Sequence, residues 1–194
     1  MDTVLLFHEE NWTDTFNEAE QRLSALQNWL KINSLTLNIS KTKYITFSIN
    51  ARSQPIKSLE LKLHECHGNN IQCNCPVIEK TQNIKYLGVI IDKNLRWDLH
   101  IKGITEKLTS LIYFFKNLRN VVNKKDMKKV YYALCHSRIE YGIIGWGSAT
   151  HTYLHNLNTI QKGIIKTILK VLIRTPSIEI FNSFDVPNVQ QIYY

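Results

Sequence analysis

The stretch "IKYLGVIIDKNLRWDLHI", residues 84–101, marks the change from a strand-containing half of the chain to a helical half. The apolar, β-branched run at its start predicts an extended segment that is interrupted by Gly88. A glycine inside a strand allows a sharp bend and a close approach of the backbone to a ligand. A basic turn with Lys93 and Arg96 then leads into a helix. Near Trp97 the period of the apolar pattern changes from two to about 3.6.

The residues ahead of this stretch predict one amphipathic helix among several strands. Thr13 is the expected N-cap, and the apolar residues after it recur every three or four positions. They are Phe16, Ala19, Leu23, Leu26 and Leu30. The run Val4–Phe7, the alternating segments 44–49 and 59–65, and residues 77–92 predict strands. This half of the chain is therefore expected to be α+β, with mostly antiparallel strands around one helix.

The residues after Trp97 predict an all-α half of about three helices. One apolar stripe contains Ile101, Ile104, Leu108, Leu111, Ile112, Phe115 and Leu118. Asn123 and Asp126 have capping-box spacing and open a second helix with Met127, Val130, Tyr131 and Leu134 inward. A third helix is expected to bury Leu154, Leu157, Ile160, Ile164, Ile168 and Leu172 and to end before Pro176.

The positive charge of the chain is concentrated in this helical half. The net charge is +8, and residues 102–174 hold 13 Lys/Arg against 3 Asp/Glu. Residues 1–101 are balanced, with 11 side chains of each sign. A basic block that is also periodic indicates a polyanion partner, most often nucleic acid. The alternative is a solvated helical surface without a partner.

Two sets of cations are the candidate phosphate contacts. The first is a ridge in which each residue follows the last by four positions, and it would extend about 18 Å along one helix. It consists of Lys162, Lys166, Lys170 and Arg174. The second set lies at a helix N-terminus and consists of Lys124, Lys125, Lys128 and Lys129. Like charges at this spacing weaken an isolated helix, so a neutralising partner is the better explanation.

Several classes of protein are not expected. No stretch reaches about 18 uninterrupted apolar residues, and the acidic N-terminus lacks the pattern of a signal peptide. The four cysteines have no disulfide-scaffold spacing, so an intracellular protein of the nucleus or cytoplasm is expected. The His- and Cys-containing segment 64–75 lacks the spacing of common zinc sites and is expected to be a polar turn.

The order of motifs resembles a known family. The motifs are "DTVLLF" at 2–7, "LNISKTKYITF" at 37–47, "KYLGVIID" at 85–92, "WDLHI" at 97–101 and "YGIIGWG" at 141–147. Together they are similar to the reverse transcriptase of non-LTR retrotransposons, the jockey-like group, over essentially the whole chain. The resemblance implies that residues 1–97 are the C-terminal part of a polymerase palm and that residues 98–194 are a helical, thumb-like domain.

The resemblance also implies roles for particular residues. Tyr86, Leu87 and Gly88 would form the primer-grip hairpin, which lies against the primer strand near its 3′ end. Asp2 matches the second aspartate of the family's Tyr-x-Asp-Asp-Thr motif and would be a catalytic magnesium ligand. A lysine after the palm helix, Lys41 or Lys43, would assist proton delivery to the leaving pyrophosphate.

The chain departs from the family in its acidic residues. Met1 stands where the first aspartate should be, and the upstream palm aspartate and the fingers have no counterpart. Nucleotidyl transfer by two magnesium ions needs several carboxylates, so one aspartate is not expected to hold the ion well. The expected function is a truncated RNA-directed DNA polymerase that is inactive alone. It would still bind an RNA template and an RNA–DNA or DNA duplex, and its other expected partner is the missing palm and fingers segment of the parent polymerase.

Two alternatives remain beside the polymerase fragment. The chain could be a non-catalytic, basic nucleic-acid-binding module, or an interaction protein whose basic surface meets an acidic protein. A steep salt dependence of duplex binding would distinguish the nucleic-acid binder from the protein binder.

Overall fold

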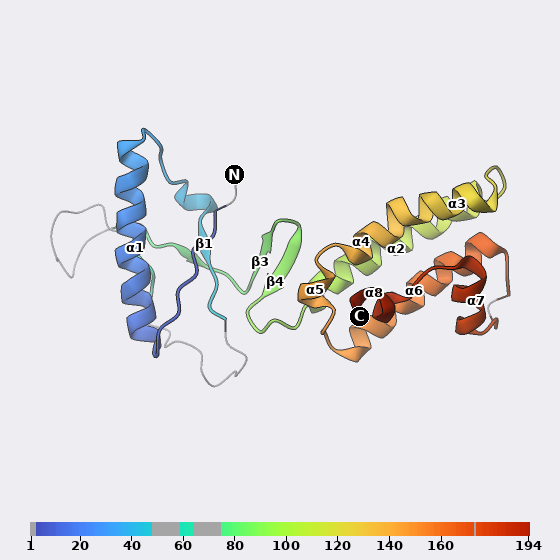
Figure 1. The fold of residues 1–194 in the computed structure, drawn as a ribbon. Helices are drawn as coiled ribbons and strands as arrows, with labels where there is room; N and C mark the ends of the chain where they lie inside the picture. Colours follow the sequence, from blue (N-terminus) through green and yellow to red (C-terminus); the bar gives the residue numbers. More distant parts are fainter. Residues whose placement is uncertain (1–2, 48–58, 64–74, 173) are drawn as a thin grey trace. The chain divides into compact units, whose positions relative to one another are not determined.

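The structure is a computed structural model of the 194-residue chain, and it describes residues 3–47, 59–63, 75–172 and 174–194. The chain forms two compact units, residues 1–95 and 96–194. The first contains one long helix and short strands, and the second is helical (Figure 1). The predicted mixture of helix and strand is confirmed. None of the helices in the described ranges is long and apolar enough to span a membrane.

The core of the first unit forms along α1 (Trp12–Ile32). The N-cap is Asn11 rather than the predicted Thr13, since the Asn11 side chain accepts a hydrogen bond from the Asp14 backbone N–H at 2.9 Å. The predicted apolar face is present. Its buried members Phe16, Ala19 and Leu23 pack with Leu61, Leu63 and Ile78.

The strands of the first unit are shorter than predicted and form two separate sheets. After the 3₁₀ turn η1 (Ile39–Lys41), β1 (Lys43–Tyr44) pairs in parallel with β2 (Glu79–Lys80). β3 (Asn83–Tyr86) pairs antiparallel with β4 (Val89–Asp92). The expectation of a mainly antiparallel sheet was therefore wrong for β1 and β2, because a long connection separates these strands and allows a parallel pairing.

Two of the predicted strands are not strands in the structure. Residues 4–7 form no strand, and Leu6 is 81% exposed. Within the described part of 59–65, only a single antiparallel bridge forms, between Lys62 and Val77. An apolar segment becomes a strand only when a neighbouring strand pairs with its backbone N–H and C=O groups. The described residues supply no such strand to residues 4–7.

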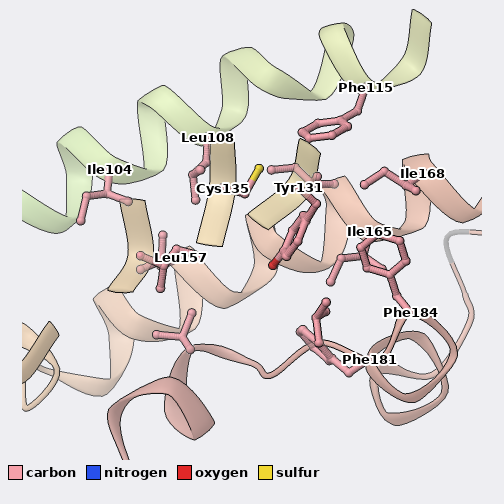
Figure 2. Packing of buried hydrophobic residues seen from close by; sticks show 14 of the residues in the cluster. Ile104, Leu108, Phe115, Tyr131, Cys135, Leu157, Ile165, Ile168, Phe181 and Phe184 are labelled. Carbon is pink, nitrogen blue, oxygen red and sulfur yellow. The ribbon is translucent and has the colours of Figure 1, made fainter. Parts of the chain in front are cut away.

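Two long helices carry the core of the second unit. α2 (Asp98–Leu118) and α6 (His151–Leu169) pack together along their lengths. The predicted stripe of α2 is confirmed, with Ile101, Ile104, Leu108 and Phe115 buried. Figure 2 shows Ile104, Leu108 and Phe115 of α2 facing Leu157, Ile165 and Ile168 of α6.

The second predicted helix is present, but its hydrogen-bonding pattern changes in the middle. α3 (Lys124–Tyr131) continues into a π-helical segment, η3 (Tyr132–His136), and then into α4 (Ser137–Glu140). The predicted cap is confirmed, because the Asn123 side chain accepts from the Asp126 backbone N–H at 2.9 Å. Tyr131 and Cys135 point into the core between α2 and α6 (Figure 2).

The C-terminal region contains short helices that the apolar pattern did not predict. They are α5 (Ile143–Trp146), α7 (Ser177–Phe184) and α8 (Val189–Tyr193). Phe181 and Phe184 of α7 close the core beside α6 (Figure 2). The buried Gln161 side chain donates to Tyr131 Oη at 2.8 Å and to the Pro187 carbonyl at 2.9 Å, which links three segments of the unit.

The third predicted helix ends earlier than expected. α6 stops at Leu169, and Lys170 has the left-handed backbone conformation, with φ 58°. Leu172, predicted to be buried, is 81% exposed. The chain reverses direction at this point, and the apolar face of α7 packs on the core. The helix therefore ends several residues ahead of Pro176, the residue that was expected to end it.

Candidate nucleic-acid interface

The segment predicted to be the primer grip is a tight β-hairpin. β3 and β4 are joined by the two residues Leu87 and Gly88, which both have positive φ values, 45° and 86°. Two positive φ values in a two-residue loop are typical of a type I′ turn, whose twist matches that of the flanking strands. Gly88 therefore lies in the turn itself, and not inside a continuous strand as the apolar run predicted.

The residue before this glycine is unusual for such a turn. Asparagine, aspartate or glycine normally occupies the first position, because other side chains are strained at positive φ. Leu87 has this conformation and is 58% exposed. An exposed leucine at a strained backbone position is a feature that folding alone does not favour.

A basic turn follows the hairpin, as the sequence predicted. The Lys93 backbone N–H donates to the Gln82 carbonyl at 3.0 Å, which holds the turn against the start of β3. Burial, and then the charge of Lys93, lower the pKa of Lys80. Lys80 comes two residues before Gln82, and Lys93 is hydrogen-bonded to Gln82, so both lysines belong to the open end of the hairpin. Sequence reasoning missed Lys80, which the pairing of β3 with β4 brings near Lys93.

The two candidate palm lysines have different surroundings. Lys43 is on β1, and its Nζ forms an ion pair with Glu79 of β2 at 3.0 Å. Lys41 ends η1, where its backbone N–H donates to the Asn38 side chain, and its ammonium has no partner in the described part of the chain. The ammonium of Lys41 is thus the more available of the two.

The candidate magnesium ligand, Asp2, lies outside the described residues. Within the described ranges, no three His, Cys, Asp or Glu side chains come together in a group that could hold a metal ion. The segment considered for zinc, apart from Cys75, also lies outside those ranges.

The lysine cluster at the start of α3 is largely engaged within the protein. Lys124 Nζ donates to the Ser183 carbonyl at 2.9 Å, and Lys128 forms an ion pair with Asp185 at 2.7 Å. Lys129 forms an ion pair with Asp126 at 2.8 Å. Lys125 has no such partner among the described residues. The contacts of Lys124 and Lys128 tie α3 to the end of α7, so part of this charge stabilises the fold.

The predicted ridge on the third helix is divided by the end of α6. Lys162 and Lys166 lie on the helix, Lys170 is its C-cap, and Arg174 follows in the turn beyond it. The prediction of a continuous ridge of four cations was therefore wrong, because the backbone leaves the helical path at Lys170.

Three of these cations instead line an open groove of about 500 Å³ together with a residue from another helix. Lys162, Lys166 and Lys170 are joined there by Arg119, which follows the last residue of α2. Two threonine hydroxyls, Thr159 and Thr167, and Ser177 at the start of α7 also line the groove, and none of its lining residues is acidic. Sequence spacing could not predict Arg119, because it approaches α6 only after the helices have packed.

Comparison with curated proteins places RNA-directed DNA polymerases of transposable elements among the relatives of the chain. It is 26% identical to the RNA-directed DNA polymerase from mobile element jockey of Drosophila funebris over 152 residues, which are 77% of this chain and 15% of the relative. It is 24% identical to the probable RNA-directed DNA polymerase from transposon BS of Drosophila melanogaster over 173 residues, which are 86% of this chain and 17% of the relative.

The resemblance predicted from the motifs is therefore confirmed, since curated relatives of the chain are jockey and other non-LTR retrotransposon polymerases. The chain spans 14–17% of the length of these relatives. No family profile matches the chain. No solved structure matches it either.

Proposed function

We propose that this chain is part of the reverse transcriptase of a non-LTR retrotransposon, in which residues 1–97 belong to the palm and residues 98–194 to the thumb. The relatives support the enzyme class. The β3–β4 hairpin, with its exposed Leu87 at the tip, supports a primer grip formed by Tyr86, Leu87 and Gly88. The helical character of the second unit supports the thumb.

The helical unit binds the template–primer duplex through phosphates. The groove lined by Arg119, Lys162, Lys166 and Lys170 is the observation that carries this proposal, because four cations converge there without a lining carboxylate. Phosphate contacts position a protein on a duplex without reading its sequence. We expect further phosphate contacts from Lys93, Arg96 and Lys125. Lys124, Lys128 and Lys129 already have partners within the helical unit.

The 194-residue chain alone does not polymerise. Magnesium, when bound, would activate the primer hydroxyl and stabilise the triphosphate, and this needs carboxylates that hold two ions a few ångströms apart. Asp2 would supply one ligand, with the others coming from the parent polymerase. Lys41, whose ammonium is unengaged among the described side chains, would donate a proton to the leaving pyrophosphate.

Duplex binding is tested by fluorescence anisotropy on a labelled RNA–DNA hybrid at several salt concentrations. Lys166→Glu should weaken binding to the hybrid and to double-stranded DNA alike, and should lower the slope of log affinity against log salt by about 0.9 per lost phosphate contact. The matched control is Lys102→Glu, which makes the same charge change at an exposed position of α2 outside the groove. Equal losses in both variants would show that net charge, and not the groove, carries the binding.

A non-catalytic nucleic-acid-binding module is the second candidate, favoured by the same groove.

Primer extension on an RNA template, with the chain alone and added Mg²⁺, tests the proposed lack of activity. Nucleotide incorporation that disappears in Asp2→Ala would contradict it.

A further inference from the structure

Arg119 is anchored at the groove by a single hydrogen bond. Its Nη1 donates to the Thr167 carbonyl in the last turn of α6, at 2.7 Å. A guanidinium has five N–H donors, and the described residues accept only this one. Its Nε is buried and has no hydrogen-bond partner among them. The group is therefore held in place by α6 while most of its donor capacity is unused, which suits an arginine that receives an anion.

Two of the groove's lysines, Lys162 and Lys170, add positive charge that no described residue neutralises. Lys162 is half-buried on α6, and Lys170 is exposed at the helix end. Neither has a hydrogen-bonding or ion-pair partner in the described part of the chain. Because like charges that share a groove repel one another, a bound anion would convert this unfavourable arrangement into a favourable one.

The conformation of Lys170 supports the same conclusion. Helices commonly end with a residue in the left-handed conformation, and glycine is the usual choice because it has no Cβ to strain the backbone. At φ 58°, Lys170 accepts a strain of about 1 kcal/mol that a glycine would avoid. Lys170 lines the groove, so the residue that carries this strain also adds positive charge there.

The remaining surroundings of the groove are suited to a phosphate group. Gly163 of α6 leaves the wall without a side chain, and apart from its own stretch of helix no atom lies within 4 Å of the position that a Cβ would take. Ser177 adds a hydroxyl where α7 begins. The groove has room for a phosphate with its adjoining sugar.

We propose that this groove is a discrete binding site for one phosphate group, held by Arg119, Lys162 and Lys170 beside Gly163. The inference rests on the proposed function for the source of that phosphate, which is a phosphodiester of the bound nucleic acid. The phosphate would sit between the end of α2 and the C-terminal half of α6, so this site would fix one point of the nucleic-acid backbone relative to the helical unit.

The test uses inorganic phosphate as the probe and the complete, ¹⁵N-labelled chain. Phosphate is titrated at constant ionic strength against chloride, and amide shifts are followed at Gly163, Lys170 and Ser177. We expect saturable shifts with a dissociation constant on the order of 1–10 mM. Lys162→Gln should weaken binding about tenfold, since it removes one charged hydrogen bond. Lys102→Gln, outside the groove, should bind as the wild type does.

The outcomes separate this inference from the proposed function. Absent shifts, or shifts that Lys162→Gln leaves unchanged, would overturn the phosphate site, even if the wild-type chain binds the hybrid duplex. Saturable shifts at the groove that Lys162→Gln weakens would support the site. If the same protein then failed to bind any duplex, the proposed function and the nucleic-acid source of the phosphate would be wrong, while the phosphate site itself would stand. An unchanged amide spectrum of Lys162→Gln before titration establishes that the variant is folded.

Discussion

Replacing Lys170 by two different uncharged residues separates backbone strain from phosphate contact. Lys170→Gly and Lys170→Gln both remove the ammonium and its favourable interaction with the C-terminus of α6. Only glycine also relieves the left-handed conformation at φ 58°. The glycine variant should therefore be more stable than the glutamine variant by about 0.5–1 kcal/mol, after allowing for the larger unfolded-state entropy of glycine.

The difference is measurable in a thermal unfolding experiment. For a unit of 99 residues, 96–194, it corresponds to roughly 2–8 °C in the midpoint of the helical unit, followed by circular dichroism. Both variants should bind phosphate and duplex more weakly than wild type, and to the same extent. A glycine variant that is no more stable than the glutamine variant would refute the strain argument. Wild-type phosphate affinity in either variant would remove Lys170 from the site.

Three further predictions concern the hairpin, a buried histidine and the core. Leu87→Asn should stabilise the β3–β4 turn by about 0.5–1 kcal/mol, measured by urea unfolding, while weakening binding to a duplex with a recessed 3′ end. Burial, and then the charge of Lys107, lower the pKa of His100, so the unfolded chain binds more protons. Stability should therefore fall as the pH drops below about 6.5, and His100→Gln should reduce that fall in urea titrations at two pH values. Tyr131→Phe removes the acceptor of the Gln161 side chain and should cost about 1–3 kcal/mol in the same assay.

Control outcomes are available for each of these. A Leu87→Asn variant that is less stable than the wild type would show that the packing of Leu87 outweighs the strain of its backbone conformation. A pH dependence identical in wild type and His100→Gln would assign it to other groups, of which His136, whose pKa burial also lowers, is the first to test. An unchanged stability of Tyr131→Phe would mean that water reaches Gln161.

The sequence by itself determined the features that depend on local spacing. The apolar stripe on α2 was read correctly, since a period of about 3.6 fixes which side chains share a helix face. The cap at Asn123 was predictable because its interaction spans three residues. The concentration of positive charge in the helical half needs no structure at all, and the motifs around Gly88 and Trp146 were enough to identify the relatives.

Only the tertiary structure decided where these elements end and which charges meet. The helical pattern continues past Leu169, but the packing of α7 on the core turns the chain at Lys170. Arg119 and Lys162 are 43 positions apart in the sequence, and they share a groove because α2 and α6 pack side by side. Likewise, the pairing of β1 with β2 occupies Lys43 with Glu79, and leaves the ammonium of Lys41 available among the described residues. Contacts between distant segments leave no periodic pattern in the sequence. The sequence can therefore predict which types of residue form such a site, but not which residues come together in it.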